Sequence, residues 1–391
     1  MAYKWLYKIK YSNKNDYEKT YYERYNSDST YRYDFCVHSY PAFVVVNTEL
    51  AKLIYEIQDL DKQLYIIQSQ LPTVALDNYK RKCLVDEVKQ TNELEGVAST
   101  RKEINDILYN RNRSNTRLNG IVNKYAMLLT GDDIALSSCT DVRNLYDELV
   151  LTEVIGSNSE NKPDGNIFRK EQVYVRDKNT GEVIHTGTYP ETETIEYMTS
   201  LLSILDDNKY NPLINIAVMH YMFGYIHPFY DGNGRMSRFI SSYLLSKNLE
   251  QIISYRLAYA IKKDTAKYYK MFKLTNDKDN RGDLTMFTIY FMELIRDILI
   301  NLNRKFSDYN DMLNTYLEQI KNSEYDDISK SVLYILIQNT LFNNEGLSIE
   351  NLSGILNKSS TTIRKIVKLL EEKDEVLKIK ARPYQYAAKI Q

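Results

Sequence analysis

The sequence predicts a mainly α-helical protein, and two observations support this prediction. Glycine and proline, which interrupt helices, number only 13 and 7 among 391 residues, about half of their usual share. Apolar residues also recur at helical spacing over long stretches, as at Leu50, Leu53, Ile54 and Ile57. A chain of this length has room for two or three domains. Its composition and expected secondary structure change along the chain and divide it into four parts.

The first two parts precede the core of the protein. Residues 1–47 are dense in Tyr, Lys and Asn, contain one strong β signal at 43–46, and have no role that the sequence indicates. Residues 48–110 predict a helical region. Its helices are expected from an Asn47–Thr48 cap onward, over 78–92, and from a capped entry at Ser99–Glu103.

The third part, residues 111–305, is expected to be a helical core with one β-hairpin. Gln172–Arg176 and Glu182–His185 have strand character and flank turn-forming residues at 177–181. A helix is expected over 213–225, and a second after the glycine-rich turn that follows this helix. A third is expected over the amphipathic stretch 289–302.

The fourth part, residues 306–391, is expected to be a linker helix and a separate small domain. Helices over 328–341, 348–356 and 360–370 and a short hairpin over 375–379 and 384–389 make the pattern of a winged helix-turn-helix. Ser360, Thr361, Thr362, Arg364, Lys365 and Lys368 take the recognition-helix positions. DNA therefore stays open as a partner. Glu371, Glu372 and Asp374 favour a module for docking a target or for self-association, so a homodimer stays open too.

Charge and cysteine content exclude several classes of function. The chain has 51 basic and 52 acidic residues, so no global field favours nucleic acid or an anionic membrane. Its three cysteines are odd in number and widely spaced, which indicates neither a disulfide framework nor a zinc site. No signal peptide and no apolar run of membrane-spanning length is evident. We expect a cytoplasmic protein with no membrane partner.

The most informative stretch runs from His227 to Arg238. Gly232 and Gly234 can adopt positive φ, so the backbone between them can form a concavity whose N–H groups point at an anion. The apolar run that follows continues as a helix. The concavity then lies at a helix N-terminus, where the dipole and the unpaired amides favour a phosphate.

The charged residues of this stretch suit the same chemistry. Arg235 and Arg238 share a helix face, and their guanidinium groups match phosphate oxygens. His227 can abstract a proton near neutral pH, and Asp231 beside phosphates is a ligand for Mg²⁺. Phosphoryl or nucleotidyl transfer is predicted. The alternative is a Gly-Asn-Gly turn between two helices with a buried histidine, a capping aspartate and solvated arginines.

This stretch resembles the signature of Fic proteins, His-x-Phe-x-Asp-Gly-Asn-Gly-Arg-x-x-Arg, at every defined position. The resemblance implies a Fic-type helical core that transfers AMP from ATP, with Mg²⁺, to a Ser, Thr or Tyr hydroxyl of a target protein, which the sequence does not identify. It implies His227 as general base and Asp231 as the metal ligand. It implies phosphate binding by Gly232, Asn233, Gly234, Arg235 and Arg238.

An upstream segment, Thr91 to Gly96, resembles the inhibitory motif Ser/Thr-x-x-x-Glu-Gly/Asn of Fic proteins that carry their own brake. The resemblance implies that Glu95 pairs with Arg238, so that ATP binds unproductively. The alternative is an acid on a solvated helix end, with Gly96 as its C-cap.

The resemblance also gives the hairpin and a tyrosine-rich helix a role. The hairpin corresponds to the family's flap, where Val173, Tyr174, Val175 and Arg176 would pair with target backbone. Tyr269 and Asn276 would contact the nucleoside. We interpret His185 as a flap surface residue and His220 as a structural histidine.

Two alternatives stay open. The same fold could remove AMP or transfer another phosphate-containing group. The chain could instead be a DNA-binding regulator whose body senses a nucleotide.

Overall fold

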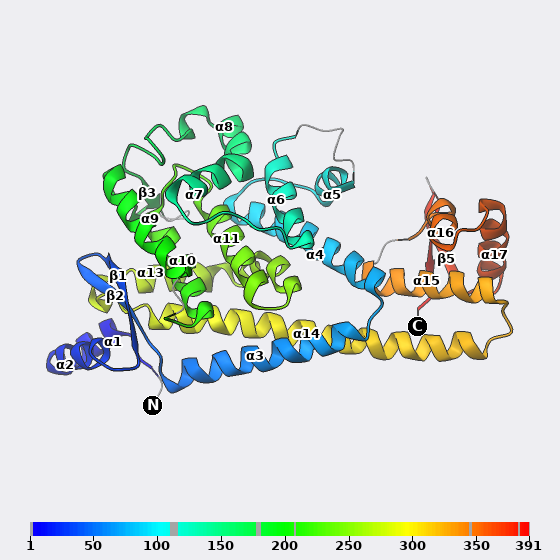
Figure 1. Cartoon of the computed structure of the whole chain (residues 1–391), viewed down its shortest axis with the longest axis horizontal. Helices are drawn as coiled ribbons and strands as arrows, with labels where there is room; N and C mark the ends of the chain where they lie inside the picture. The colour runs from blue at the N-terminus through cyan, green and yellow to red at the C-terminus, as the bar shows by residue number, and fades with distance from the viewer. Residues whose placement is uncertain are drawn as a thin grey trace. The chain divides into compact units, whose positions relative to one another are not determined.

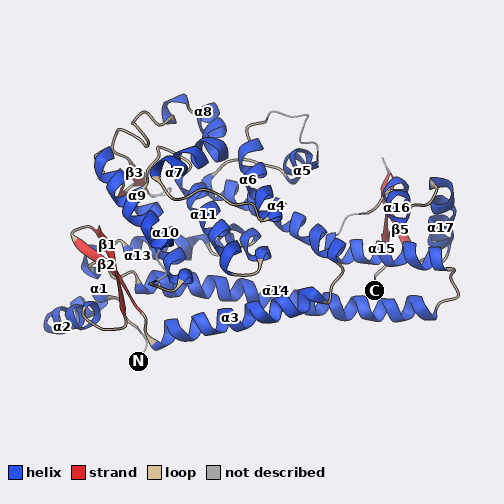
Figure 2. Ribbon diagram, viewed as in Figure 1, coloured by secondary structure: helices blue, strands red, loops and turns tan. Residues whose placement is uncertain are grey.

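The computed structural model confirms a mainly helical protein with few, short strands (Figures 1 and 2). It describes residues 3–109, 116–176, 181–206, 209–343, 346–381 and 384–390. The chain divides into two compact units, Met1–Asp61 with Cys83–Leu299 and Lys62–Lys82 with Ile300–Gln391. The four-part division expected from the sequence stays a prediction.

The first 47 residues form two helices and a hairpin. These are α1 (Leu6–Ser12), α2 (Lys14–Tyr25), β1 (Thr30–Val37) and β2 (Tyr40–Val45). The two strands pair antiparallel, and Phe43 of β2 extends the pairing to Asp283. Arg24 forms an ion pair with Asp283 at 3.0 Å, and Arg281 forms two hydrogen bonds with Glu18. This N-terminal module is thereby joined to the loop before α14.

Two long helices follow the module. They are α3 (Thr48–Ser69) and α4 (Thr73–Glu95), and each contributes residues to both units. The Asn47 side chain caps α3, as predicted, and α4 begins earlier and ends later than expected. The next helix, α5 (Arg101–Tyr109), is capped by the hydroxyl of Thr100, which accepts from the Glu103 N–H at 3.1 Å. The prediction of a Ser99 cap was wrong, because Ser99 Oγ has no partner among the described residues.

The core of the first unit is built around α10 (Pro212–Ile226) and α11 (Asn233–Asn248). Twelve residues of α10 are buried, from Leu213 to Ile226, because neighbouring helices cover every face of it. The surrounding elements are α6 (Asn119–Thr130), α7 (Cys139–Tyr146), the π-helical turn η1 (Asp147–Leu151), α8 (Thr152–Ser157), η2 (Ser159–Asn161) and α9 (Glu191–Asp206).

The predicted hairpin is present as β3 (Tyr174–Arg176) and β4 (Val183–Thr186), which pair antiparallel (Figure 1). The predicted turn at 177–180 lies outside the described residues. After α11 the chain continues through η3 (Gln251–Tyr255), α12 (Leu257–Lys263), α13 (Thr265–Thr275), η4 (Lys278–Asn280) and the long α14 (Thr285–Asn322).

The second unit contains the C-terminal elements in the predicted order. These are α15 (Asp327–Asn343), α16 (Ile349–Leu356), α17 (Ser360–Glu372), β5 (Val376–Ala381) and β6 (Tyr384–Ala388). Ser348 caps α16 in a capping box with Asn351, and the strands pair antiparallel. The assignment as a winged helix stays an interpretation.

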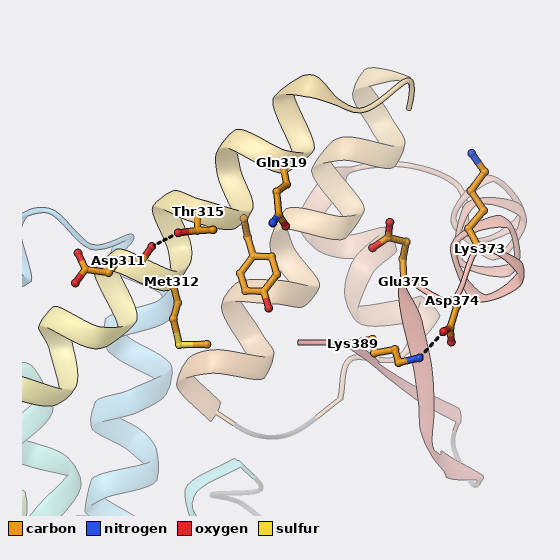
Figure 3. A pocket seen from close by; sticks show the side chains of 9 residues that line it. Asp311, Met312, Thr315, Gln319, Lys373, Asp374, Glu375 and Lys389 are labelled. Carbon is orange, nitrogen blue, oxygen red and sulfur yellow. Dashed lines mark hydrogen bonds and ion pairs between the residues drawn. The ribbon is translucent and has the colours of Figure 1, made fainter. Parts of the chain in front are cut away.

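The second unit also has a polar groove of about 630 Å³ (Figure 3). Side chains of the C-terminal half of α14, among them Met312 and Gln319, line it together with the segment Lys373–Glu375 and Lys389. None of the predicted site residues lies in this groove. In the part of the chain that the structure describes, no helix has both the length and the apolar character needed to cross a bilayer.

Candidate active site

The junction between α10 and α11 positions His227. This residue ends α10 in the left-handed conformation, with φ 54°, and its N–H donates to the carbonyl of Phe223. Its Nδ1 lies 3.3 Å from the carbonyl oxygen of Gly224. A carbonyl can only accept, so this contact places the proton on Nδ1 and leaves the Nε2 lone pair available to a substrate.

The surroundings of His227 keep its ring neutral. Burial, and then the nearby ring of His185, lower the pKa of His227 to about 4. At neutral pH the imidazole can therefore accept a proton, as a general base must.

The loop that leads into α11 is tightly packed around Gly232. Gly232 adopts φ 81°, and a Cβ there would meet Val150 at 3.0 Å and Tyr146 at 3.3 Å, so only glycine fits. The side-chain amide of Asn233 donates to the Phe229 carbonyl at 2.8 Å, and its Oδ1 accepts from the backbone N–H of Phe229 at 3.0 Å. The side chain of Asn233 thus closes the loop, and what remains for a phosphate is the backbone of the helix start.

Arg235 is buried, with 1% of its surface exposed, and is held by a carboxylate that sequence reasoning missed. Its Nη1 contacts Glu153 of α8, whose other oxygen accepts from Ser157 at 3.0 Å. Arg235 Nε and Nη2 have no hydrogen-bond partner among the described residues. Since buried donors are rarely left unpaired, they are suited to an anionic ligand.

Asp231 lies beside these donors and is the most exposed charged group of the motif. Its Oδ1 accepts from the Gly232 N–H at 2.5 Å and lies 3.8 Å from Arg235 Nη2, and its side chain is 42% exposed. No cluster of three metal-ligating side chains occurs in the described ranges. One carboxylate beside a phosphate site is nevertheless the arrangement by which proteins commonly hold Mg²⁺, so the residues present fit this ion.

Arg238, also 1% exposed, is engaged by the C-terminal end of α4. Its Nη2 lies 2.6 Å from Glu95 Oε1 and 3.0 Å from the carbonyl oxygen of Thr91, and its Nε donates to Thr91 Oγ1 at 2.7 Å. Burial lowers and Glu95 raises the pKa of Arg238, with a net increase. The predicted pairing of Glu95 with Arg238 is therefore present.

The carboxylate of Glu95 also lies on the backbone of α11. A Cβ at Gly234 would come 2.1 Å from Glu95 Oε1 and 3.0 Å from Arg238 Nη1. Gly96 ends α4 with φ 82°, which turns the chain directly after the acidic residue. An anionic group thus already occupies the start of α11, beside a buried guanidinium.

The remaining predicted residues are placed around this centre. Tyr269 is 38% exposed, and burial first and then the charge of Glu95 raise the pKa of its hydroxyl. The Asn276 amide donates to His185 Nδ1 at 3.2 Å, so it contacts the hairpin. His220 is buried and contacts Ser241 and Tyr268, each at 2.8 Å, as expected of a structural histidine.

The hairpin lies beside the catalytic loop. The Val173 carbonyl accepts from the Gly187 N–H at 3.1 Å, and Tyr174 is 52% exposed. Val175 pairs with His185, and Arg176 with Val183. A Cβ at Gly187 would lie 3.1 Å from His227 Cβ, so the base of the hairpin touches the histidine.

The sequence around this site is similar to that of a known protein family. Residues 137–245 match the Fic/DOC family, a range that includes His227, Asp231 and both arginines. The chain contains a Fic domain. A solved Fic family protein from Desulfovibrio desulfuricans has the same fold, with a TM-score of 0.55 at 18% identity, over 88% of this chain and 97% of that one.

Curated relatives match less than a third of this chain. "Protein adenylyltransferase Fic" from Drosophila mojavensis is 32% identical over 118 residues, and the protein of the same name from Drosophila grimshawi is 31% identical over 118 residues. The match spans 30% of this chain and 22% of each relative. Those names describe the relatives as adenylyltransferases.

Proposed function

We propose that this protein transfers AMP from ATP to a Ser, Thr or Tyr hydroxyl of a target protein and that Glu95 restrains the reaction. The observation that carries the proposal is the carboxylate of Glu95 on Gly234, beside the guanidinium of Arg238. It marks the start of α11 as an anion site. The neutral ring of His227 and the unpaired donors of Arg235 belong to the same turn.

In the proposed reaction His227 Nε2 accepts the proton of the target hydroxyl. The hydroxyl oxygen forms a bond to the α-phosphorus of ATP, and the bond from that phosphorus to the bridging oxygen of the β-phosphate breaks. Pyrophosphate leaves with the bonding electrons. Arg235 Nε and Nη2 and the amides at the start of α11 bind phosphate oxygens and stabilise the charge that develops there.

Asp231 would hold Mg²⁺ through its exposed carboxylate. When bound, this ion neutralises phosphate charge. Asp231 directly precedes Gly232, and its Oδ1 accepts from the Gly232 N–H, so its carboxylate lies at the start of α11.

The proposed restraint follows from charge and space. With Glu95 in place, one Nη2 hydrogen of Arg238 is taken, and a carboxylate occupies the surface of Gly234 where the terminal phosphate of ATP would otherwise lie. The carboxylate of Glu95 and the phosphates of ATP are both negatively charged, so they repel each other strongly at contact distance. ATP then binds with its phosphates displaced from His227.

The experiment uses ATP labelled in its α-phosphate and, in parallel, ATP labelled in its γ-phosphate, with Mg²⁺ and a cell lysate. We expect Glu95→Gly to attach the α-label to protein and to add no γ-label beyond that of the lysate alone, and we expect Glu95→Gly/His227→Ala to attach the α-label at least about 10²-fold more slowly. Added γ-label without α-label would indicate phosphoryl transfer instead. No incorporation by Glu95→Gly, in a variant that binds ATP, would refute the proposal.

Removal of AMP is the alternative reaction. It is distinguished by isolating the labelled product and incubating it with wild-type protein and without ATP. Loss of label as AMP would assign the removal reaction to wild type, whereas retained label supports transfer.

A further inference from the structure

Four successive carbonyls at the end of α10 are bound by donors from one neighbouring segment. The carbonyl of Tyr225 accepts from His185 Nε2 at 2.5 Å, and that of Ile226 from the Thr188 N–H at 3.1 Å. The His227 carbonyl accepts from Arg169 Nε at 2.8 Å, and the Pro228 carbonyl from the Arg169 N–H at 3.2 Å. All donors lie within or beside the hairpin β3–β4.

Arg169 is the centre of this arrangement. It is fully buried, and among the described residues its guanidinium donates only to carbonyls. Besides the His227 carbonyl, these belong to Glu171 before β3 and Thr188 after β4, both at 2.7 Å, and to Ile226 at 3.4 Å. One planar group therefore joins the two ends of the hairpin to the catalytic histidine.

A buried cation without a carboxylate partner is costly, so its presence here requires compensation. Burial lowers the pKa of Arg169. The negative end of the α10 dipole and several well-aligned acceptors offset this cost. The fit is close, because a Cβ at Gly187 would come 2.5 Å from Arg169 Nη2.

His185 provides a second connection on β4. Its Nε2 donates to the Tyr225 carbonyl, so its Nδ1 must accept from the Asn276 amide, and both ring nitrogens are satisfied only in the neutral form. The N-terminal module contacts the same two residues, Tyr225 and Asn276. The backbone N–H of His38 donates to the Tyr225 hydroxyl at 2.7 Å, and its Nε2 lies 2.8 Å from the Asn276 carbonyl oxygen.

We infer that Arg169 is a positioning residue that fixes the hairpin to the catalytic loop, so that a peptide held by the hairpin presents its hydroxyl to His227 Nε2. This inference rests on the proposed function. A displacement of about 1 Å at a reacting centre can cost about 10² in rate. The guanidinium touches neither the α11 anion site nor Asp231 in any contact of the described residues, so ATP binding is expected to be independent of it.

The test compares Arg169→Lys and Arg169→Met in the Glu95→Gly background, with Glu191→Gln as a matched control. Glu191 accepts from the N–H groups of the loop just before Arg169, and among the described residues it has no hydrogen bond to the hairpin or to His227. We expect kcat for transfer to protein to fall about 10²-fold in Arg169→Met and less in Arg169→Lys, with the KM for ATP unchanged. Glu191→Gln is expected to retain kcat.

Amide hydrogen exchange gives a readout that needs no catalysis. The Gly187 and Thr188 amides, which donate to Val173 and Ile226, should exchange faster in both Arg169 variants and not in Glu191→Gln. Unchanged kcat and unchanged exchange would overturn the inference. So would parallel losses of transfer and ATP binding, because they would make Arg169 a folding residue. If Glu95→Gly itself transferred nothing, the proposed function would fail, and exchange would still decide whether Arg169 fixes the hairpin.

Discussion

Arg235 and Arg238 occupy the same turn of α11 and are equally buried, yet their carboxylate partners differ. Glu153, the partner of Arg235, has a side chain only 5% exposed and is itself held by Ser157. Glu95, the partner of Arg238, is 24% exposed and lies on Gly234. Glu153 therefore belongs to the framework of the site, whereas we propose that Glu95 occupies the place of a ligand. Removing them should therefore have opposite effects on activity.

The largest expected effect comes from Glu153→Ala. Loss of Glu153 removes the carboxylate that contacts the buried Arg235 directly, and breaking a buried ion pair in this way typically costs about 3–5 kcal/mol of stability. Chemical denaturation should show this loss, and transfer in the Glu95→Gly background should fall with it. Glu153→Gln, which keeps an acceptor, is the control and should lose less. A stable and fully active Glu153→Ala protein would contradict a framework role.

Glu95→Gly tests the other partner. We expect labelling to rise about 10²-fold if the restrained state dominates. Stability should fall by less than the about 3–5 kcal/mol typical of a fully buried pair, because Glu95 is 24% exposed. Arg238→Ala should abolish transfer with either residue at position 95. Equal labelling by wild type and Glu95→Gly would remove the distinction between the two carboxylates.

Asp231→Ala tests whether the metal belongs to the anion site. Transfer should be lost, and ATP should bind more weakly and without dependence on Mg²⁺, because the only exposed carboxylate of the motif is gone. The measurement is ATP affinity with and without Mg²⁺, with Asp133→Ala as a control at an exposed carboxylate that pairs with Lys247. Unchanged Mg²⁺ dependence in Asp231→Ala would assign the ion to another ligand.

How much of this could be read from the sequence depends on distance along the chain. The stretch His227–Arg238 is contiguous, so its chemistry and its helix start are visible locally. Glu153 lies 82 residues before its partner, and an acidic residue in a helix of a chain with 26% charged residues gives no local signal. The role of Arg169 could not be predicted for a similar reason. Its partners are backbone carbonyls, which every residue has, so the sequence does not indicate which of them it contacts.

The fold shows the same limit. Helical periodicity and caps predicted α3 and α10 well, since both signals are local. The N-terminal module was not interpretable, because its role depends on contacts such as that of Arg24 with Asp283, which only the folded chain brings together. For Asn233 the motif is visible in the sequence, and the resemblance implies phosphate binding. In the structure its side chain donates to the Phe229 carbonyl and closes the loop.

The pH dependence of transfer distinguishes His227 from an ordinary histidine. Burial first, and then His185, lower its pKa to about 4, and the neutral ring is the active form. Activity of Glu95→Gly should therefore persist as pH falls to 5.5, where a histidine of pKa 6.5 would have lost about tenfold. Initial rates from pH 8 to 5 check this. An acid limb centred near 6.5 would show that His227 is solvated when the enzyme works.

The smallest expected effect is that of Thr91→Val, which removes one hydroxyl and keeps the branched shape. Arg238 Nε then loses its acceptor at Thr91 Oγ1, while the Thr91 carbonyl still accepts from Nη2. A buried donor left without a partner costs about 1–3 kcal/mol, so the restrained state should weaken and labelling rise several-fold, less than in Glu95→Gly. The double variant Thr91→Val/Glu95→Gly decides between two roles for this hydroxyl. If Thr91 serves only to hold Arg238 against Glu95, the double variant should label as fast as Glu95→Gly alone. A slower double variant would mean that Thr91 also orients Arg238 for ATP, and that α4 contributes to the active state as well as to its restraint.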